Sequence, residues 1–249
     1  DKDIADQVYI EPLTVSVLEK IIAKEKPDSV LPTLGGQAGL NLGMELEEKG
    51  ILEKYDVQVL GTPVQAIIDT EDREIFANKL REIDVKTPRS IAANSMEEAI
   101  AASKELGFPI IVRAAYTLGG LGSGFCSDEE ELRKLAASAF SYSPQVLIEE
   151  SILGWEELEL EVVRDAKGNM ITVCFIENID PLGVHTGDSF CSAPMLTISE
   201  DVQKRLQEQA YKIVDEVQVI GGTNVQFAHD PVSDRIVVIA VSYTHLTLP

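Results

Sequence analysis

The first 65 residues of the chain alternate between helical and extended hydrophobic patterns. Apolar residues recur at helical spacing over residues 15–24, and a second helical pattern covers residues 37–49. Each is followed by a short apolar run, at residues 29–31 and 57–60, which ends at a proline or a glycine. The order helix, strand, helix, strand predicts a fragment of a parallel α/β sheet.

A second unit is expected to begin near residue 70. Its helices are predicted at residues 72–83 and 95–106, and its strands at residues 86–92 and 109–112. Two serine–glutamate pairs have the spacing of a capping box, in which a serine side chain accepts a hydrogen bond at the start of a helix. These pairs are Ser95 with Glu98, and Ser127 with Glu130.

From residue 145 onward the pattern becomes mainly extended. Strands are predicted at residues 145–150, 156–164, 170–177 and 190–193, followed by a helix at 197–217 and a hairpin at 224–228 and 235–240. Glutamates alternate with apolar residues from Glu157 to Val162. Such alternation is typical of an antiparallel sheet with one face in the core and the other in solvent. The fold class predicted for the whole chain is therefore α/β plus α+β.

Composition and charge change this picture by excluding some classes of protein. The formal charge is -21, which disfavours binding to the phosphate backbone of a nucleic acid. No apolar stretch is long enough to span a membrane, and the acidic start lacks a signal-peptide pattern. Because the chain starts without methionine, we expect it to begin inside a longer protein. The three cysteines do not have zinc-site spacing and are interpreted as free thiols in a reducing cytosol.

The glycine-rich segment 117–124 is a candidate for binding a polyanion. It lies between a predicted strand and a predicted helix, and its glycines would let backbone N–H groups approach phosphate closely. Arg113 lies just before it, and a guanidinium suits phosphate oxygens. The segment matches neither a Walker loop nor a dinucleotide-binding GxGxxG unit, so a plain hairpin is an equally good explanation.

Three other places carry polar side chains with both a functional and a structural interpretation. Glu149 and Glu150 end a predicted strand, where carboxylates bind ribose hydroxyls or simply face water. His185 lies in the polar segment 183–189 and could bind phosphate or act as an acid or base, although a polar turn explains it as well. Gln226 could bind a metal through its carbonyl oxygen or complete a structural hydrogen-bond network.

Taken together, these segments resemble the large subunit of carbamoyl-phosphate synthases. The motifs that carry the resemblance occur in the family's order, at residues 9–12 (Tyr-Ile-Glu-Pro), 32–37 (Pro-Thr-Leu-Gly-Gly-Gln), 71–73 (Glu-Asp-Arg), 111–113 (Ile-Val-Arg) with the glycine-rich segment, 154–155 (Gly-Trp), 176–178 (Ile-Glu-Asn), 183–189 and 224–228. No single motif is decisive, but the ordered set is specific. Several of its forms resemble the first of the family's two homologous halves.

The resemblance implies an architecture and a set of site residues. Residues 1–68 would be the later part of a Rossmann-like pre-ATP-grasp domain, and residues 69–239 a truncated ATP-grasp domain that holds ATP between two lobes. The implied nucleotide-site residues are Arg73, Arg113, Gly119, Gly120, Glu150, Ile152, Glu157, Gly183, Val184, His185 and Gln226. Arg113 and His185 would be catalytic, Glu157 would hold the ribose, and Gln226 would also bind Mg²⁺ or Mn²⁺.

The implied activity is that of an ATP-dependent ligase in the cytoplasm. Bicarbonate would attack the γ-phosphate of ATP to form carboxyphosphate, and ammonia would convert this to carbamate during carbamoyl phosphate synthesis. The implied partners are a glutaminase small subunit and further copies in an oligomer of heterodimers, with neither nucleic acid nor membrane. The implied pathways are arginine and pyrimidine biosynthesis.

The chain departs from the family pattern at its C-terminal end. After residues 235–239 the family continues with Glu-x-Asn-Pro-Arg, in which the Glu and the Asn are metal ligands. Ala240 replaces that glutamate here, and Ser242 replaces that asparagine. Residues 240–249 are therefore interpreted as a tail unrelated to the family, and the fragment itself is expected to be inactive.

Two alternative functions remain open. A ligase similar to the biotin-dependent carboxylases would also activate bicarbonate, although residues 183–189 favour the synthase. A non-catalytic nucleotide-binding module is the second alternative, because the implied metal ligands are missing. Analysis of the products would separate the two enzymes, and ATP binding without turnover would indicate the module.

Overall fold

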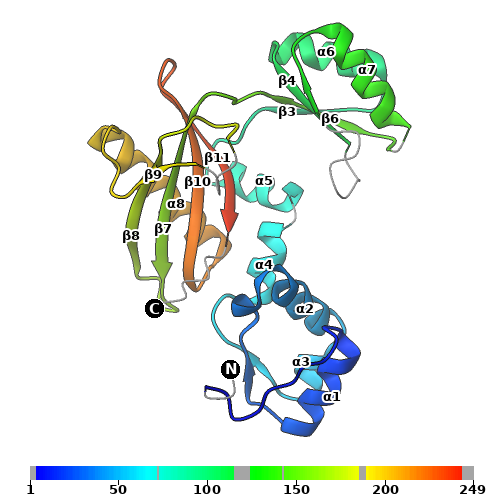
Figure 1. Cartoon of the computed structure of the whole chain (residues 1–249), viewed down its shortest axis with the longest axis vertical. Helices are drawn as coiled ribbons and strands as arrows, with labels where there is room; N and C mark the ends of the chain where they lie inside the picture. Colours follow the sequence, from blue (N-terminus) through cyan, green and yellow to red (C-terminus); the bar gives the residue numbers. More distant parts are fainter. Residues whose placement is uncertain (1–3, 72, 115–123, 142, 185–188, 243–249) are drawn as a thin grey trace.

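The chain folds into an N-terminal layer followed by a small lobe and a large lobe (Figure 1). The computed structural model describes residues 4–71, 73–114, 124–141, 143–184 and 189–242. These residues form three separate sheets, of two, four and five strands. None of the described helices is both long enough and apolar enough to cross a membrane. The mixture of a parallel layer with antiparallel sheets confirms the predicted fold class.

The N-terminal layer is a small parallel α/β unit. Its elements are α1 (Val15–Glu25), β1 (Ser29–Val30), the 3-10 helix η1 (Pro32–Gly35), α2 (Gly36–Glu48), α3 (Ile51–Lys54) and β2 (Gln58–Val59). The two strands pair in parallel, as the alternation of helix and strand predicts. Aliphatic side chains such as Ile22, Leu46 and Leu52 form its core. The short helix α3 is not predicted by the hydrophobic pattern.

Two helices, α4 (Val64–Glu71) and α5 (Arg73–Glu82), lead from this layer to the rest of the chain. The pattern does not predict α4, although its Ala66 and Ile67 join the main hydrophobic core. Thr62, two residues before α4, also fixes this junction. Its hydroxyl donates to the carbonyl of Ile220 at 2.8 Å and accepts from the N–H of Ile220 at 3.3 Å. The domain division proposed near residue 69 falls within α4.

The small lobe is a four-stranded antiparallel sheet covered on one face by two helices. Its elements are β3 (Ser90–Ala93), α6 (Met96–Leu106), β4 (Ile110–Ala114), β5 (Gly124–Cys126), α7 (Glu129–Phe140) and β6 (Val146–Glu150). The strand order is β3-β6-β4-β5. Both helices contribute to one aliphatic core with the sheet, and Figure 1 shows them side by side on it.

Capping differs from the prediction at one of the two helices. Ser95 caps α6, because its hydroxyl accepts a hydrogen bond from the N–H of Glu98 at 3.2 Å. At α7 the predicted cap Ser127 is wrong by one residue. Asp128 accepts from the N–H of Glu131 at 2.9 Å, while the Glu131 carboxylate accepts from the N–H of Ser127 at 2.7 Å. Aspartate caps as well as serine does, so the pattern alone does not choose between neighbours.

The large lobe is a five-stranded antiparallel sheet packed on one long helix. Its elements are β7 (Glu156–Arg164), β8 (Met170–Asn178), β9 (Cys191–Ser192), α8 (Glu200–Val217), β10 (Gly221–Asp230) and β11 (Arg235–Ser242), with strand order β11-β10-β7-β8-β9. Leu158, Leu160 and Val162 of β7 pack with Leu206 and Ile213 of α8 in the main core. The predicted helix and closing hairpin are therefore both present.

The prediction of a solvent-facing side on β7 is wrong. Glu157 and Glu159 are only 6% and 8% exposed. The alternation of the sequence correctly separates two faces of the strand, but it does not report what covers the second face. The glutamates are therefore interior residues, and each needs partners.

Candidate functional site

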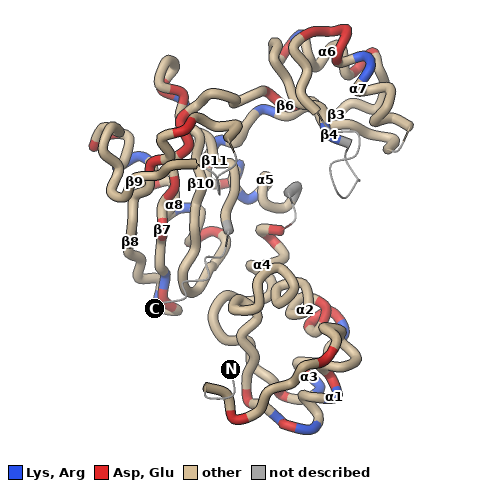
Figure 2. Tube along the Cα trace, viewed as in Figure 1, with Lys and Arg blue, Asp and Glu red and all other residues tan. Residues whose placement is uncertain are grey.

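The side of the large sheet opposite α8 carries a set of polar side chains, here called the polar face. Its members are Glu157, Glu159 and Glu161 of β7 with Asn224 and Gln226 of β10. The register places Gln226 opposite Glu159 and Asn224 opposite Glu161. Because residues two apart on a strand share a face, these side chains lie together. Figure 2 shows the acidic positions that recur along β7.

Glu159 lies at the centre of a network built from neutral amides. One of its carboxylate oxygens accepts from the Nδ2 group of Asn178 at 2.9 Å, and the other accepts from Nδ2 of Asn224 at 2.8 Å. The same Asn224 nitrogen donates to Glu161 at 2.9 Å. The amide of Asn224 therefore bridges two carboxylates that lie side by side in the interior.

The network leaves one polar atom unsatisfied. The carbonyl oxygen of Asn224 is buried and has no hydrogen-bond partner among the described residues. A buried acceptor without a donor costs about 1–3 kcal/mol, so a donor or a cation would be favoured there. Within the described part of the chain, however, no group of three His, Cys, Asp or Glu side chains could hold a metal ion.

Apolar side chains cover one end of the polar face. Ile152 packs against Ala228 of β10 and Val237 of β11, with Trp155 and Leu182 beside them. The register also places Glu157 opposite Ala228. An apolar wall with a carboxylate at its border suits a flat, partly apolar ligand that carries hydroxyl groups, such as a nucleoside.

Gly183 allows two loops to approach each other beside this wall. Its φ is +119°, and a Cβ added there would lie 2.2 Å from Cδ1 of Leu153. Backbone hydrogen bonds join the same loops, from Gly154 N to Leu182 O at 2.9 Å and from Leu182 N to Trp155 O at 2.8 Å. A side chain at position 183 would push the loops apart and alter the wall.

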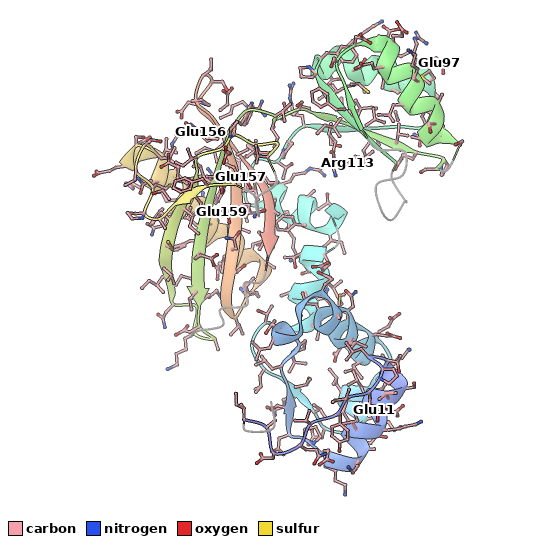
Figure 3. All side chains as sticks on the ribbon, viewed as in Figure 1. Glu11, Glu97, Arg113, Glu156, Glu157 and Glu159 are labelled. Atoms are coloured by element: carbon pink, nitrogen blue, oxygen red, sulfur yellow. The ribbon has the colours of Figure 1, made fainter. Side chains whose placement is uncertain are left out.

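Arg113 lies in the small lobe, near the end of β4. Its Nε donates to the Glu149 carboxylate at 2.6 Å, and its side chain is 39% exposed. In Figure 3 it lies on the side of the small lobe that is turned toward the large lobe, where Glu157 and Glu159 are labelled on β7. The Glu149 contact orients the guanidinium, whose planar shape suits a two-point contact with phosphate.

Glu150 lies where the small lobe ends, and two arginines surround its carboxylate. Arg89 and Arg235 both form ion pairs with it at 2.8 Å. Burial raises the pKa of Glu150, but hydrogen bonds from Arg235 and Arg89 outweigh this effect and lower it to about 2. The carboxylate is therefore ionised and engaged within the protein.

The structure brings together only some of the predicted site residues. Ile152, Glu157, Gly183 and Gln226 come together on or beside the polar face, and Val184 directly follows Gly183 with 41% of its surface exposed. Arg113 and Glu150 belong to the small lobe and to the junction between the lobes. Arg73 begins α5, but its side chain is not described. The predicted residues outside the described part are Gly119, Gly120 and His185.

The strand β11 continues into the first residues of the predicted tail. Ala240 pairs with Gln226, and Ser242 pairs with Asn224. The backbone thus preserves the strand, while Ala240 places a methyl group in the cross-strand pair with Gln226. The division at residue 240 stays a prediction, and residues 243–249 lie outside the described part.

Five residues with central contacts were not predicted as site residues. For Glu159 and Asn224 a signal existed, because β7 and β10 each carry polar residues at every second position, and pairing the two patterns would have indicated a shared interior network. Asn178 ends β8 and lies outside that pattern. Arg89 and Arg235 gave no signal, since each is an isolated cation in the sequence and meets Glu150 only through the fold.

Comparison with known families covers nearly the whole chain. Residues 72–244 match the carbamoyl-phosphate synthase L chain, ATP binding domain, and residues 1–69 match the carbamoyl phosphate synthase preATP-grasp domain. The biotin carboxylase-β,γ-ATP complex of Campylobacter jejuni has a TM-score of 0.73 at 20% identity, over 94% of this chain and 53% of that chain. At this identity the similarity shows the fold alone.

Large chains of one enzyme family are among the similar proteins of known sequence. The carbamoyl phosphate synthase large chain of Thermotoga maritima is 49% identical over 245 residues, which is 97% of this chain and 22% of that protein. The arginine-specific mitochondrial large chain of Neurospora crassa is 50% identical over 228 residues, which is 92% of this chain and 20% of that protein.

The two lobes and the layer before them define an ATP-grasp protein with a preceding pre-ATP-grasp region. More specifically, the chain belongs to the carbamoyl-phosphate synthase large-chain family. It spans 22% of the length of the Thermotoga maritima relative.

Proposed function

We propose that this chain is the nucleotide-binding part of the carboxyphosphate-forming half of a carbamoyl-phosphate synthase. The observation that carries the proposal is the polar face with its apolar wall. Glu157 and Gln226 lie there on neighbouring strands, beside Ile152. They come from segments far apart in sequence, and each is a position at which the family resemblance implies nucleotide contact.

Three of the described residues have a proposed role toward ATP. The wall around Ile152 would contact the adenine, the Glu157 carboxylate would accept hydrogen bonds from the ribose hydroxyls, and Arg113 would donate to phosphate oxygens. Gly119, Gly120 and His185 are proposed to contact the phosphates as well, from segments outside the described residues. The Campylobacter jejuni neighbour is a complex with β,γ-ATP, which supports ATP as the ligand.

The proposed reaction is phosphoryl transfer. A bicarbonate oxygen attacks the γ-phosphorus of ATP, the bond to the β-phosphate oxygen breaks, and carboxyphosphate and ADP form. Ammonia then attacks the carboxyphosphate carbon, so that phosphate leaves and carbamate results. The residues of this chain would mainly position the reactants and stabilise spread negative charge.

The residues present do not complete a metal site of the family type. Mg²⁺ or Mn²⁺ would accompany ATP, and Gln226 could bind it through its amide oxygen. Ala240, however, supplies no carboxylate in its pair with Gln226. We therefore propose that this chain alone does not turn over ATP. The same observation favours a second candidate function, a nucleotide-binding module without catalysis.

The proposed partners are those that the family resemblance implies. They are bicarbonate and ammonia as substrates and a glutaminase small subunit, within an oligomer of heterodimers. We propose a cytoplasmic location and roles in arginine and pyrimidine biosynthesis, although the Neurospora crassa relative is mitochondrial. A biotin carboxylase-like activity is less well supported, since that similarity is at 20% identity against 49% for the large chain.

The test uses a chimera in which this chain replaces the matching region of the Thermotoga maritima large chain. We expect Ala240→Glu/Ser242→Asn to give bicarbonate-stimulated ADP release, and the unsubstituted chimera to give roughly 1% of that rate or less. Ala137→Glu/Ser138→Asn on exposed positions of α7 is the matched control and should not rescue. A folded Ala240→Glu/Ser242→Asn chimera without ADP release would contradict the proposal. Equal release by both chimeras would show that the two ligands are not needed.

A further inference from the structure

The carboxylate of Glu150 has no capacity left for a ligand. Its Oε1 accepts from the backbone N–H of Arg89 at 2.8 Å and from Nη2 of Arg235 at 2.8 Å. Its Oε2 accepts from Nε of Arg89 at 2.8 Å and from Nη1 of Arg235 at 3.2 Å. A carboxylate offers about four acceptor positions, and all four are used here. Glu150, which is 6% exposed, therefore cannot contact a nucleotide through its side chain without breaking these bonds.

The three residues of this cluster come from both lobes and from the connections between them. Arg89 ends the first connection, which enters the small lobe before β3, and Glu150 ends β6, just before the second connection at residues 151–155. Arg235 begins β11 in the large lobe. Figure 1 shows the two connections running together between the lobes. The cluster thus lies where a rotation of one lobe against the other would bend the chain.

Each arginine also makes a further contact outside the cluster. Arg89 donates from Nη2 to the carbonyl of Leu106 at the end of α6, at 3.3 Å. The guanidinium of Arg235 lies over the ring of Trp155, 5.3 Å from its centroid. A continuous set of contacts therefore runs from α6 through Glu150 to β11, and it ends at the aromatic residue that borders the apolar wall.

Two backbone hydrogen bonds lie along the same set of contacts, and the exchange rates of their N–H groups can show whether these contacts are intact. The N–H of Glu150 donates to the carbonyl of Arg89 at 2.9 Å, which joins the two connections. The N–H of Val238 in β11 donates to the carbonyl of Lys86 at 2.8 Å, which holds the first connection on the large lobe. Rotation of the lobes would strain both bonds together with the ion pairs.

We propose that Arg89 and Arg235 are positioning residues that clamp Glu150 and so hold the two lobes at one relative orientation. The side chain of Glu150 then contributes to nucleotide binding by fixing the wall at Ile152 relative to Arg113, and not by contacting the ligand itself. The effect on the nucleotide rests on the proposed function, whereas the clamp between the lobes does not depend on it.

Hydrogen exchange of the chain without nucleotide tests the clamp. We expect Arg235→Ala to speed exchange at the amides of Glu150 and Val238 about ten-fold, and Arg235→Lys about three-fold, because lysine keeps the charge without the two-point contact. Amides that donate between β4 and β6 or between β7 and β10 should not change, which separates a freed hinge from general destabilisation. Arg133→Ala, which removes an arginine–glutamate pair inside α7, is the matched control. Unchanged exchange at both amides in a folded Arg235→Ala protein would overturn the clamp, and Glu150→Gln provides the same test if that variant does not fold.

A titration with MgATP then tests the positioning role, in the chain that carries Ala240→Glu/Ser242→Asn. We expect Arg235→Ala to weaken binding about ten-fold and Arg235→Lys about three-fold, with Arg133→Ala unchanged. Equal affinity with and without Arg235→Ala would overturn the positioning role. If no variant binds MgATP, the proposed function fails for this chain, while the exchange rates still decide whether the clamp exists.

Discussion

The two lobes bury different kinds of side chain. The small-lobe core consists of aliphatic residues and Cys126, and its buried polar residues are Ser103, Ser143 and the junction residue Glu150. The large lobe also has an aliphatic core, but it buries in addition a larger set of polar residues, namely Glu157, Glu159, Arg164, Glu177, Asn178, Thr223, Asn224 and His229.

This difference indicates how the two lobes divide their tasks. An aliphatic interior requires matching volumes, whereas buried carboxylates require donors at defined positions. The small lobe can therefore present functional groups at its surface, such as Arg113, without involving its core. In the large lobe, stability and site chemistry depend on the same buried network, so mutations there should affect both.

The largest expected effect separates rate from stability in the small lobe. In the chimera with Ala240→Glu/Ser242→Asn, Arg113→Ala should lower bicarbonate-dependent ADP release by about 100- to 1,000-fold, which corresponds to about 3–4 kcal/mol. Arg113→Lys should recover part of this rate. Thermal unfolding should change little, because Arg113 is 39% exposed. A near-normal rate in folded Arg113→Ala would refute the phosphate role.

The second effect concerns pH and Glu150, which is buried and is the one charged residue so placed among those that the structure describes in the small lobe. Its pKa is lowered to about 2 from an ordinary value of 4.5, so its ionised form stabilises the fold above pH 4.5 and this contribution is lost as pH falls toward 2. The shift corresponds to about 3 kcal/mol. We expect Glu150→Gln to reduce the unfolding free energy at pH 7, and the difference from the wild type to vanish near pH 2. Urea unfolding across this range gives the measurement, and a difference independent of pH would contradict the assignment.

The third effect tests whether the interior of the large lobe depends on charge balance. Asn224→Asp would put a further carboxylate beside Glu159 and Glu161, and we expect a loss of about 2 kcal/mol in unfolding free energy. The matched control is Asn169→Asp, because Asn169 also donates to a carboxylate, that of Asp165, but in an exposed turn. This control should change stability by about 0.5 kcal/mol or less. Equal losses in the two variants would show that burial of the network is unimportant.

The smallest effect concerns the start of α7 in the small lobe. Asp128→Ala should reduce stability by about 1 kcal/mol, since it removes the side chain that accepts from Glu131. Ser127→Ala should have almost no effect, because only the backbone N–H of Ser127 takes part in the cap. Thermal unfolding of both variants decides between the two residues. A larger loss of stability in Ser127→Ala than in Asp128→Ala would show that Ser127 caps the helix, as the sequence predicts.

The elements that sequence predicts well are those with a long local pattern. The helix over 15–24, the strand over 156–164 and the long helix that became α8 each carry enough periodic positions to be identified. β5 was not predicted, because its three residues pair with β4 across the glycine-rich segment and carry no pattern of their own. The site shows the same limit. Gln226 could be selected from its motif, but the contacts of Arg235 with Glu150, 85 residues away, depend on tertiary structure.

The two hydrogen bonds between Thr62 and Ile220 have a consequence for the order in which the protein folds. It joins positions 158 residues apart, and the whole small lobe lies within the loop that it closes. The strands of that lobe pair only with one another, so it can fold on the ribosome while later residues are still being made. Ile220 immediately precedes β10, which brings Asn224 and Gln226. Synthesis from the N-terminus therefore completes the polar face only after the small lobe has been made, and a pause in translation before residue 220 would leave a finished small lobe beside an unfinished site.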